Sequence, residues 1–200
     1  MERTLAARKR ESRFHGLLIV DKPGDPAPGA PHSLGGAPTS HNVVQMARRW
    51  SGQRRIGHTG TLDPMASGVL VLCLGHATRL VEYYQRHDKQ YYAEMALGAA
   101  TDTYDATGAV VAQGPAPMLD RGSLDEALAR FRGDILQTPP AYSAIKQQGE
   151  ALYRKARRGE AVEIEPRRVT IRRLDLLDYE PGRRLCLRVV CSAGAYIRSL

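Results

Sequence analysis

Residues 57–68 read GHTGTLDPMASG and are the most informative stretch of this chain. Glycines on both sides of Asp63 permit a tight loop, and Pro64 restricts the backbone of Asp63 to extended or turn geometry. The apolar residues 69–74 follow at once and predict a buried strand that anchors the loop. Such a loop can hold one carboxylate rigidly at the mouth of a cleft. On residue types alone, an Asx turn at Asp63 and an ordinary hydrogen-bonding His58 explain the pattern as well.

The segments before this loop predict one strand and one helix. Residues 17–20 form a short apolar run that ends at a Pro-Gly turn, which is typical of a buried strand. Thr39 or Ser40 can cap the helix that follows, because its hydroxyl can accept a hydrogen bond from the first turn. The apolar residues of this helix recur at helical spacing and are Val43, Val44, Ala47 and Trp50.

The segments after the loop predict further strands and helices. Residues 91–97 alternate with the period of a strand, and residues 109–112 read as its paired return strand. Residues 123–126 match a capping box at the start of a helix. Residues 169–177 and 184–192 predict two long strands. Because the elements follow one another without regular βαβ alternation, we expect an α+β fold with a mixed, mostly antiparallel sheet flanked by helices.

Composition excludes several classes of protein. The chain has 200 residues, of which 42% are hydrophobic and 25% charged, so it is not a wholly disordered chain. Its longest apolar run, residues 69–74, is too short to span a bilayer, and residues 17–20 are too short for the core of a signal peptide. The cysteines Cys73, Cys186 and Cys191 form no CxxC pair, which favours a reducing compartment. We therefore expect a cytoplasmic protein without a membrane partner.

The chain is strongly basic. Lys and Arg number 29 and Asp and Glu 21, which gives a net charge of +8. Most of the basic residues are arginines, a bias that a GC-rich genome explains without any function. A polyanionic partner explains it as well, because arginine binds phosphate groups through a bidentate fork. Arginine doublets occur along the whole chain and indicate a broad positive face rather than a basic tail.

Common cofactor and metal motifs are absent from the sequence. It contains no Gly-Lys-Ser/Thr phosphate loop, no GxGxxG turn and no HExxH helix. Cys73 and His76 have the spacing of metal ligands, but no second pair accompanies them, so a buried cysteine beside an ordinary histidine is the better interpretation. The sequence thus predicts no metal and no cofactor, and leaves a cofactor-free reaction or no reaction.

Ordered motifs along about nine tenths of the chain resemble the TruB family of tRNA pseudouridine synthases. They begin with GLLIVDKP and TSHNVV and continue through residues 57–68. The others, in chain order, are LCLGHATRL (72–80), DKQYY (88–92), TDTYD (101–105), QTPPAYSAIK (137–146) and CSAGAYIRSL (191–200). So many matches in one order make a chance likeness implausible.

The resemblance implies an enzyme, an intramolecular transferase that isomerises the uridine at position 55 in the T loop of tRNA to pseudouridine. It implies no metal and no organic cofactor. Asp63 matches the catalytic aspartate of the family, and Arg198 matches the arginine that pairs with this carboxylate and keeps it ionised. Whether the aspartate attacks the base or assists elimination from the ribose stays open at this point.

Other positions of the family site follow from the same motifs. Tyr91 matches the tyrosine that stacks on the target base, and it is the candidate for the later proton removal. His58 matches a histidine that supports the extruded nucleotide, because the base must leave its stack before the enzyme can reach it. Tyr196 matches a tyrosine that lines the pocket, and Leu200 is expected to contact the substrate. Lys22 belongs to a Lys-Pro motif that is either structural or in contact with RNA.

The same likeness predicts the domain organisation. We expect a disordered basic tail over residues 1–14 and a catalytic domain over residues 15–200, with a Pro/Gly-rich loop insertion at about residues 24–38. Family members continue beyond the position of Leu200 and usually add a PUA-type RNA-binding domain, which this sequence lacks. We expect a monomer that binds the T arm of tRNA. The alternatives are a tRNA-binding or chaperone protein with impaired catalysis, and a basic surface without an RNA function.

Overall fold

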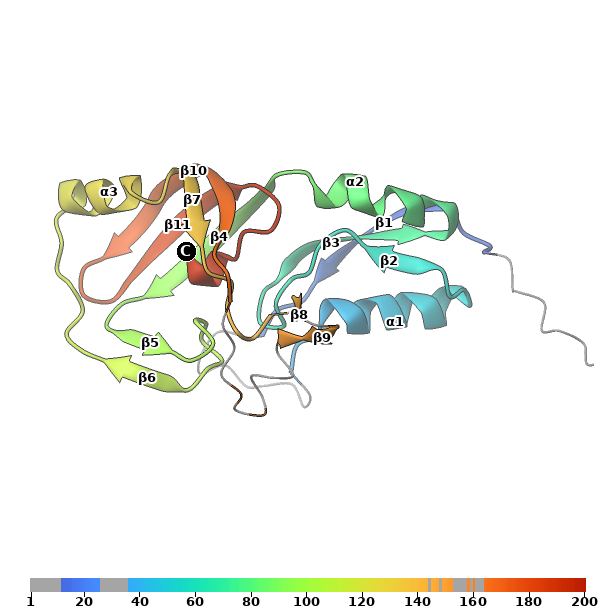
Figure 1. Ribbon diagram of the computed structural model, residues 1–200, viewed down its shortest axis with the longest axis horizontal. Coiled ribbons are helices and arrows are strands. Elements are labelled where there is room, and N and C mark those ends of the chain that lie inside the picture. Colours follow the sequence, from blue (N-terminus) through green and yellow to red (C-terminus); the bar gives the residue numbers. More distant parts are fainter. Residues whose placement is uncertain are drawn as a thin grey trace, which may run out of the picture. The chain divides into compact units, whose positions relative to one another are not determined.

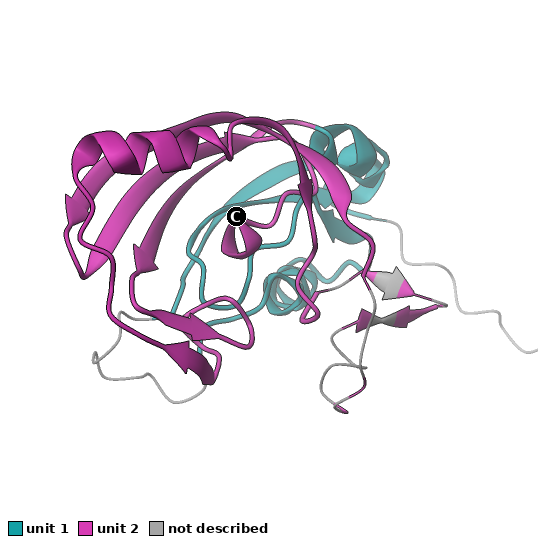
Figure 2. Ribbon diagram, turned by 60° about the vertical axis from the view of Figure 1, so that its left-hand side comes forward, with its two compact units in different colours: residues 1–86 teal, residues 87–200 magenta. Residues whose placement is uncertain are grey.

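The computed structural model describes residues 12–25, 36–143, 145–147, 149–152, 158, 160 and 164–200. The chain divides into two compact units, unit 1 (residues 1–86) and unit 2 (residues 87–200) (Figure 2). All strand pairings in the described parts are antiparallel, and helices pack on the sheets. The expected α+β fold is therefore confirmed. Most of the predicted tail and insertion, residues 1–11 and 26–35, lies outside the described residues.

Unit 1 is built on a three-stranded sheet in which β3 (Gly68–Leu74) lies between β1 (Gly16–Lys22) and β2 (Ile56–His58) (Figure 1). Helix α1 (Ser40–Ser51) packs on one face of this sheet. Alternate residues of the strands point toward the helix, as the period of a strand requires. The buried core consists of Val43, Val44, Ala47, Ile56, Leu70, Leu72 and Leu74.

The start of α1 agrees with the prediction, and its last turn differs from it in one detail. Thr39 is the N-cap, and its hydroxyl accepts a hydrogen bond from the N–H of Asn42 at 3.1 Å. Ser40 is the first helical residue, and its hydroxyl binds another segment. Trp50 was expected on the apolar face but is 68% exposed, because Ser51 takes the buried position of the last turn. The helix ends at Gly52, whose φ of 67° is the left-handed conformation that glycine adopts most easily.

Unit 2 is built on a four-stranded sheet with the order β4-β11-β10-β7. Its strands are β4 (Lys89–Ala96), β7 (Gly133–Gln137), β10 (Arg167–Glu180) and β11 (Arg184–Cys191). Helix α3 (Arg121–Ala129) packs on the sheet through Leu124 and Leu128. The remaining elements are η1 (Gly75–Leu80) and α2 (Val81–Gln85) in unit 1, and β5 (Ala99–Thr101), β6 (Val110–Gln113), β8 (Lys146–Gln147), β9 (Glu150–Ala151) and η2 (Ile197–Ser199) in unit 2.

Two local predictions in unit 2 are wrong. The expected return strand near residues 109–112 pairs with β5, whereas β4 pairs with the distant β11. The reason is Gly98, whose φ of 85° turns the chain so that a separate hairpin begins after β4. Helix α3 begins at Arg121 rather than at the predicted capping box, because the carboxylate of Asp120 accepts a hydrogen bond from the N–H of Ser123 at 2.9 Å.

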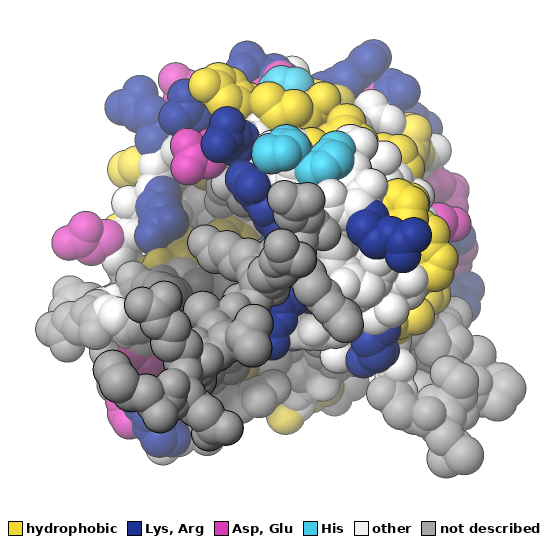
Figure 3. Space-filling model, turned by 90° about the vertical axis from the view of Figure 1, so that its right-hand side faces the viewer, with side chains coloured by type: hydrophobic (Ala, Val, Ile, Leu, Met, Phe, Trp, Pro, Cys, Tyr) yellow, Lys and Arg dark blue, Asp and Glu magenta, His cyan; other side chains and the backbone are white. Residues whose placement is uncertain are grey.

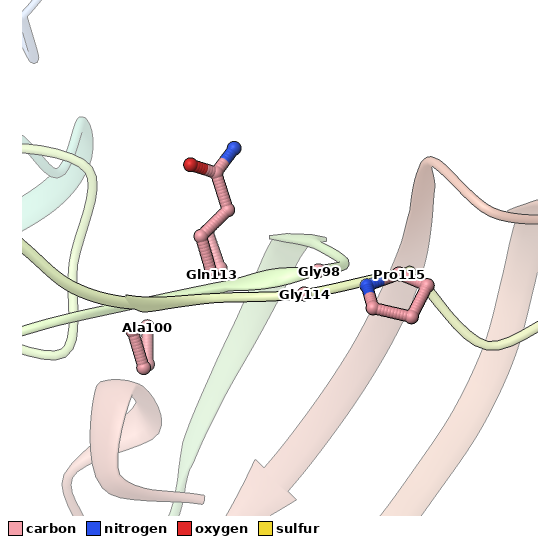
Figure 4. A pocket seen from close by; sticks show the side chains of 7 residues that line it. Gly98, Ala100, Gln113, Gly114 and Pro115 are labelled. Atoms are coloured by element: carbon pink, nitrogen blue, oxygen red, sulfur yellow. The ribbon is translucent and has the colours of Figure 1, made fainter.

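The hairpin of β5 and β6 borders an open hollow of about 260 Å³. It is lined by glycine, alanine and proline together with Gln113, and Figure 4 shows the side chains of Ala100 and Gln113 extending to opposite sides of the hairpin. This hollow therefore offers few polar groups for binding a ligand.

The cysteines give a test of the packing. Cys73 and Cys191 are buried, at 0% and 1% exposure, and burial raises the pKa of both thiols, that of Cys191 to about 11. Cys186 is half-exposed. Because the thiolate is the reactive form, we expect a thiol reagent at neutral pH to label Cys186 in the folded protein and all three cysteines after denaturation. Mass spectrometry of the labelled peptides checks this, and rapid native labelling of Cys73 would contradict the packing of unit 1.

Candidate active site

Asp63 lies in the loop between β2 and β3 of unit 1 and is half-buried. The loop makes a tight turn at this residue, because the N–H of Ala66 donates to the carbonyl oxygen of Asp63 at 3.1 Å. The following strand β3 is the central strand of its sheet. The loop is thus anchored as the sequence predicted, and the carboxylate sits on a turn rather than on a long flexible segment.

Lys22 fixes the backbone of this loop. It is the last residue of β1 and is fully buried, at 0% exposure. Its ammonium group donates to the carbonyl oxygens of Pro23 at 2.9 Å, Pro64 at 2.8 Å and Ala66 at 2.7 Å. An ammonium group has three protons, so these bonds use all of them. Of the two roles expected for Lys22, these contacts support the structural one.

The electrostatics of Lys22 agree with its burial. Loss of solvent lowers the pKa of Lys22, and the neighbouring carboxylates of Asp25 and Asp63 partly oppose this shift. The three hydrogen bonds of the Lys22 ammonium group are here called the Lys22 clamp. The negative charge of Asp63 helps to keep this ammonium group protonated, and the clamp in turn holds the loop that carries Asp63.

Two further contacts fix the loop from other segments. The hydroxyl of Ser40 donates to the carbonyl oxygen of Leu62 at 3.0 Å and accepts from the N–H of Leu62 at 2.9 Å. The N–H of Asp25 donates to the carbonyl oxygen of Met65 at 3.1 Å. A side chain at Gly24 would collide with that same carbonyl, so glycine permits the close approach. The loop is held from β1, from α1 and from the segment after β1.

His58 is the last residue of β2, opposite Leu72 of β3, and is half-buried. Burial lowers the pKa of His58, the nearby His41 lowers it further, and the backbone of Gly60 partly opposes the shift. The imidazole is therefore more often neutral than that of a free histidine at the same pH.

This shift predicts a pH dependence of stability. The folded pKa of His58 lies below the ordinary value of 6.5, so just below that pH the unfolded chain binds a proton that the folded chain releases. The free energy of unfolding should therefore rise with pH in this interval, and it should rise less in His58→Gln. Urea unfolding of both proteins from about pH 5 to about pH 7 tests this. Parallel pH profiles would contradict the buried environment of His58.

In unit 2, Arg198 lies in η2 and forms an ion pair with Asp105. The guanidinium Nη1 is 3.8 Å from the Asp105 carboxylate, and the two side chains are only 10% and 9% exposed. Arg198 also donates to the carbonyl oxygens of Thr103 at 3.1 Å and Tyr142 at 2.7 Å. These contacts fix the guanidinium in one orientation.

Asp105 is itself held by hydrogen bonds. Its carboxylate accepts from the Thr103 hydroxyl at 2.8 Å, the Thr107 hydroxyl at 2.6 Å and the Thr107 N–H at 3.0 Å. Burial alone raises the pKa of Asp105, but these bonds and the charge of Arg198 outweigh it and lower the pKa. Asp105 is thus an ionised, buried partner for Arg198.

Tyr196 lies close to this pair. The side chain of the buried Gln137 donates to the carbonyl oxygen of Tyr196 at 2.9 Å and accepts from its N–H at 2.8 Å. The guanidinium carbon of Arg198 is 6.0 Å from the centre of the Tyr196 ring. Arg198 and Leu200 line a cavity of about 600 Å³. Arg198, Tyr196 and Leu200 are therefore brought together within unit 2.

Tyr91 is on β4, opposite Val189 of β11, and is half-buried against the core of unit 2. The predicted site residues thus form two sets. Lys22, His58 and Asp63 belong to unit 1, and Tyr91, Tyr196, Arg198 and Leu200 belong to unit 2.

Three residues that support these two sets were not predicted as site residues. Asp105 and Gln137 stand in the motifs TDTYD and QTPPAYSAIK, and Ser40 stands in TSHNVV. The motifs marked these segments as important. What each side chain binds depends on contacts with residues far along the chain, so no local spacing could assign the roles.

No cluster of three or more His, Cys, Asp or Glu side chains that could hold a metal ion occurs in the described part of the chain. Among the helices of the same residues, none has the length and apolar character needed to cross a membrane.

Residues 48–197, three quarters of the chain, match the N-terminal domain of the TruB family pseudouridylate synthases. This stretch contains the Asp63 loop, Tyr91, Asp105 and Tyr196. The chain therefore belongs to the TruB family, and the resemblance seen in its motifs is confirmed.

Curated relatives agree with this membership. The chain is 54% identical over 197 residues to tRNA pseudouridine synthase B of Symbiobacterium thermophilum, a match that covers 98% of this chain and 62% of the relative. It is 48% identical over 162 residues to the protein of the same name from Caldanaerobacter subterraneus subsp. tengcongensis. This match covers 81% of this chain and 57% of the relative. The chain thus spans about three fifths of the length of these relatives.

Solved structures show the same fold. A chain in the crystal structure of a Cbf5-Nop10-Gar1 complex aligns with a TM-score of 0.62 at 29% identity, over 92% of this chain and 42% of that one. A chain in the structure of an H/ACA RNP bound to a substrate RNA that contains 2′-deoxyuridine aligns with a TM-score of 0.60 at 26% identity, over 92% and 40%.

Proposed function

We propose that this protein is a tRNA pseudouridine synthase that isomerises the uridine at position 55 of the T loop. The observation that carries the proposal is the family match over residues 48–197, because it includes the clamped Asp63 loop. The relatives bear the name tRNA pseudouridine synthase B, which supports tRNA as the substrate. We further propose that the protein acts as a cytoplasmic monomer.

The proposed reaction exchanges one glycosidic bond for another. The bond between N1 of the base and C1′ of the ribose breaks, the base turns, and C5 forms a new bond to C1′. The hydrogen at C5 leaves as a proton and N1 gains a proton, so the exchange is balanced without an oxidant or a reductant.

Each candidate residue has a role in this proposal. Asp63 acts at the sugar–base junction as an ionised carboxylate, whether by attack on the base or by assisting elimination from the ribose. Arg198 pairs with Asp63 and is itself oriented by Asp105. Tyr91 stacks on the base and is the candidate for removing the C5 proton. The clamp of Lys22 supports the proposal, because a catalytic carboxylate must be held within a fraction of an ångström of its productive position.

The remaining residues are proposed to hold the target nucleotide. His58 supports the extruded nucleotide with a neutral imidazole. Tyr196 and Leu200 line the pocket for the base, and Tyr196 is fixed through its backbone by Gln137. A base that has left the helix needs such stacking and apolar contacts to offset the lost stacking in RNA.

Release of tritium from a tRNA transcript labelled at C5 of uridine tests the proposal directly. The expected result is release that reaches one tritium for each tRNA, together with loss of the signal when the uridine at position 55 is replaced by cytidine. Tight binding of tRNA without release would instead support a tRNA-binding protein with impaired catalysis.

A further inference from the structure

The end of unit 1 opposite the Asp63 loop carries an exposed pair of stacked aromatic rings, Phe14 and Trp50, here called the aromatic platform. The ring centres are 5.5 Å apart and the planes differ by 18°. Trp50 is 68% exposed and Phe14 42% exposed. Large aromatic side chains are usually buried in soluble proteins, so this exposed pair suggests a binding surface.

The platform is held in place by the fold. The buried side chain of Gln53 accepts from the N–H of Phe14 at 2.9 Å and donates to its carbonyl oxygen at 3.1 Å. The next residue, His15, stacks on His76 with ring centres 4.4 Å apart and accepts from the N–H of His76 at 3.0 Å. Phe14 thus belongs to an ordered segment, although the sequence placed it in a disordered tail.

Glycine at position 75 allows the segment of Phe14 and His15 to pack against η1. A side chain there would collide with the imidazole of His15 and with the carbonyl oxygen of Phe14. Phe14, His15 and Trp50 are therefore preorganised, which lowers the entropy that a ligand would otherwise lose on ordering them.

Three exposed arginines adjoin the platform in sequence. Arg13 precedes Phe14, Arg49 precedes Trp50, and Arg54 follows the turn at Gly52, and all three are exposed. Within the described parts of the chain, none of the three forms an ion pair. Figure 3 shows a face on which adjacent histidine side chains have Lys and Arg side chains around them.

Four of the exposed arginines of unit 2 differ in this respect. Arg168 pairs with Asp134, Arg172 with Asp88, Arg173 with Asp175, and Arg183 with Glu180. Arg49 lies in the last turn of α1, where the negative end of the helix dipole stabilises a positive charge. This effect explains an arginine at position 49, but it does not explain Arg13 or Arg54, which lie outside the helix. Exposed arginines that form no ion pair with the described residues, and that adjoin an open aromatic pair in sequence, have the character of a site for single-stranded nucleic acid.

The platform is separate from the Asp63 loop. Lys22, which clamps that loop, is at one end of β1, and Gly16, which follows His15, is at the other. A strand of this length places the two ends about 20 Å apart. One RNA molecule could contact both, but one nucleotide could not.

We propose that the aromatic platform binds a second segment of the RNA substrate, with an unpaired base stacked on Trp50 and phosphate groups bound by Arg49 and Arg54. The inference rests on the proposed function for the identity of that RNA as tRNA. The chemistry of the surface requires only an RNA strand with an accessible base.

Trp50 is the single tryptophan of the sequence, so its fluorescence reports on the platform alone. We expect a tRNA transcript and a uridine oligonucleotide each to quench this fluorescence, with midpoints that rise with salt concentration. Duplex DNA, which lacks unpaired bases, should quench much less. Trp50→Ala should weaken binding of the oligonucleotide, measured on filters, by about tenfold.

A charge reversal provides the second test. The double variant Arg49→Glu/Arg54→Glu should raise the RNA concentration at half-maximal quenching about tenfold or more. It should also reduce the slope of log affinity against log salt concentration by about 1 to 2. The control Arg168→Glu/Arg183→Glu makes the same change of charge on unit 2 and should shift the midpoint by less than about threefold. Melting curves of all variants show whether they fold.

The outcomes separate this inference from the proposed function. Tritium release by the parent protein with no change of Trp50 fluorescence at saturating tRNA would overturn the platform and leave the synthase. Quenching by the oligonucleotide without tritium release would support the platform and count against the synthase. Equal midpoints for the parent and the Arg49→Glu/Arg54→Glu variant, or equal quenching by duplex DNA, would also overturn the platform.

Discussion

Asp63→Asn is expected to lower tritium release from labelled tRNA by about 10³-fold or more, while tRNA binding stays nearly unchanged. The substitution keeps the shape of the side chain and removes its negative charge. Either proposed route needs an ionised carboxylate at the glycosidic bond, so an amide cannot replace it.

The loop itself should survive this substitution. Lys22, Ser40 and the N–H of Asp25 hold the loop through backbone groups of residues 62–66, and none of these bonds uses the Asp63 side chain. Asp21→Asn, which removes an exposed carboxylate from β1 of the same unit, is the matched control and should keep full activity. Normal turnover by Asp63→Asn would refute the role of Asp63, and loss of activity in both variants would point to a general effect of charge.

Lys22→Met is expected to lower the free energy of unfolding of unit 1 by about 3 kcal/mol and to reduce turnover strongly. Methionine fills nearly the same volume but donates no hydrogen bonds. The carbonyl oxygens of Pro23, Pro64 and Ala66 then lose their donor in a buried place. Two of these carbonyls belong to the Asp63 loop, so the loop loses its anchor together with the stability.

Urea unfolding and tritium release under the same conditions check this prediction. Lys89→Met makes the same chemical change at a partly buried lysine that donates to the carbonyl oxygen of His87, and it should cost less than about 1 kcal/mol. Lys22→Arg keeps the charge and the donors and should retain more stability than Lys22→Met. If Lys22→Met unfolds like the parent protein, the clamp contributes nothing and the geometry around Asp63 must be maintained by other contacts.

Local sequence signals predicted most of the secondary structure. The apolar run of residues 69–74 became the central strand β3, and the helical spacing of Val43, Val44 and Ala47 became the buried face of α1. These signals succeed because burial of alternate or every third to fourth residue is a property of a short segment. The family motifs likewise indicated the segments that carry Asp63 and Arg198.

Contacts between distant segments were not predictable in the same way. The pairing of β4 with β11 joins residues about a hundred positions apart, whereas the sequence favoured the nearer residues 109–112 as the partner. Lys22 bonds to backbone carbonyls, which every residue has, so no side-chain pattern revealed the clamp. The ion pair of Arg198 with Asp105 depends on the fold of unit 2 and was likewise hidden.

The register of β4 against β11 also has a consequence for synthesis on the ribosome. The strands of unit 1 pair within residues 16–74, so its sheet can form as soon as this segment has left the exit tunnel. Lys89 pairs with Cys191, so β4 cannot pair in the sheet until β11, about a hundred residues further along the chain, has been synthesised. Loop closure over such a distance is slow, and until then β4 exposes backbone groups without hydrogen-bond partners. Unit 1 should therefore fold first during translation, and nascent chains stalled before residue 184 should need chaperones for unit 2.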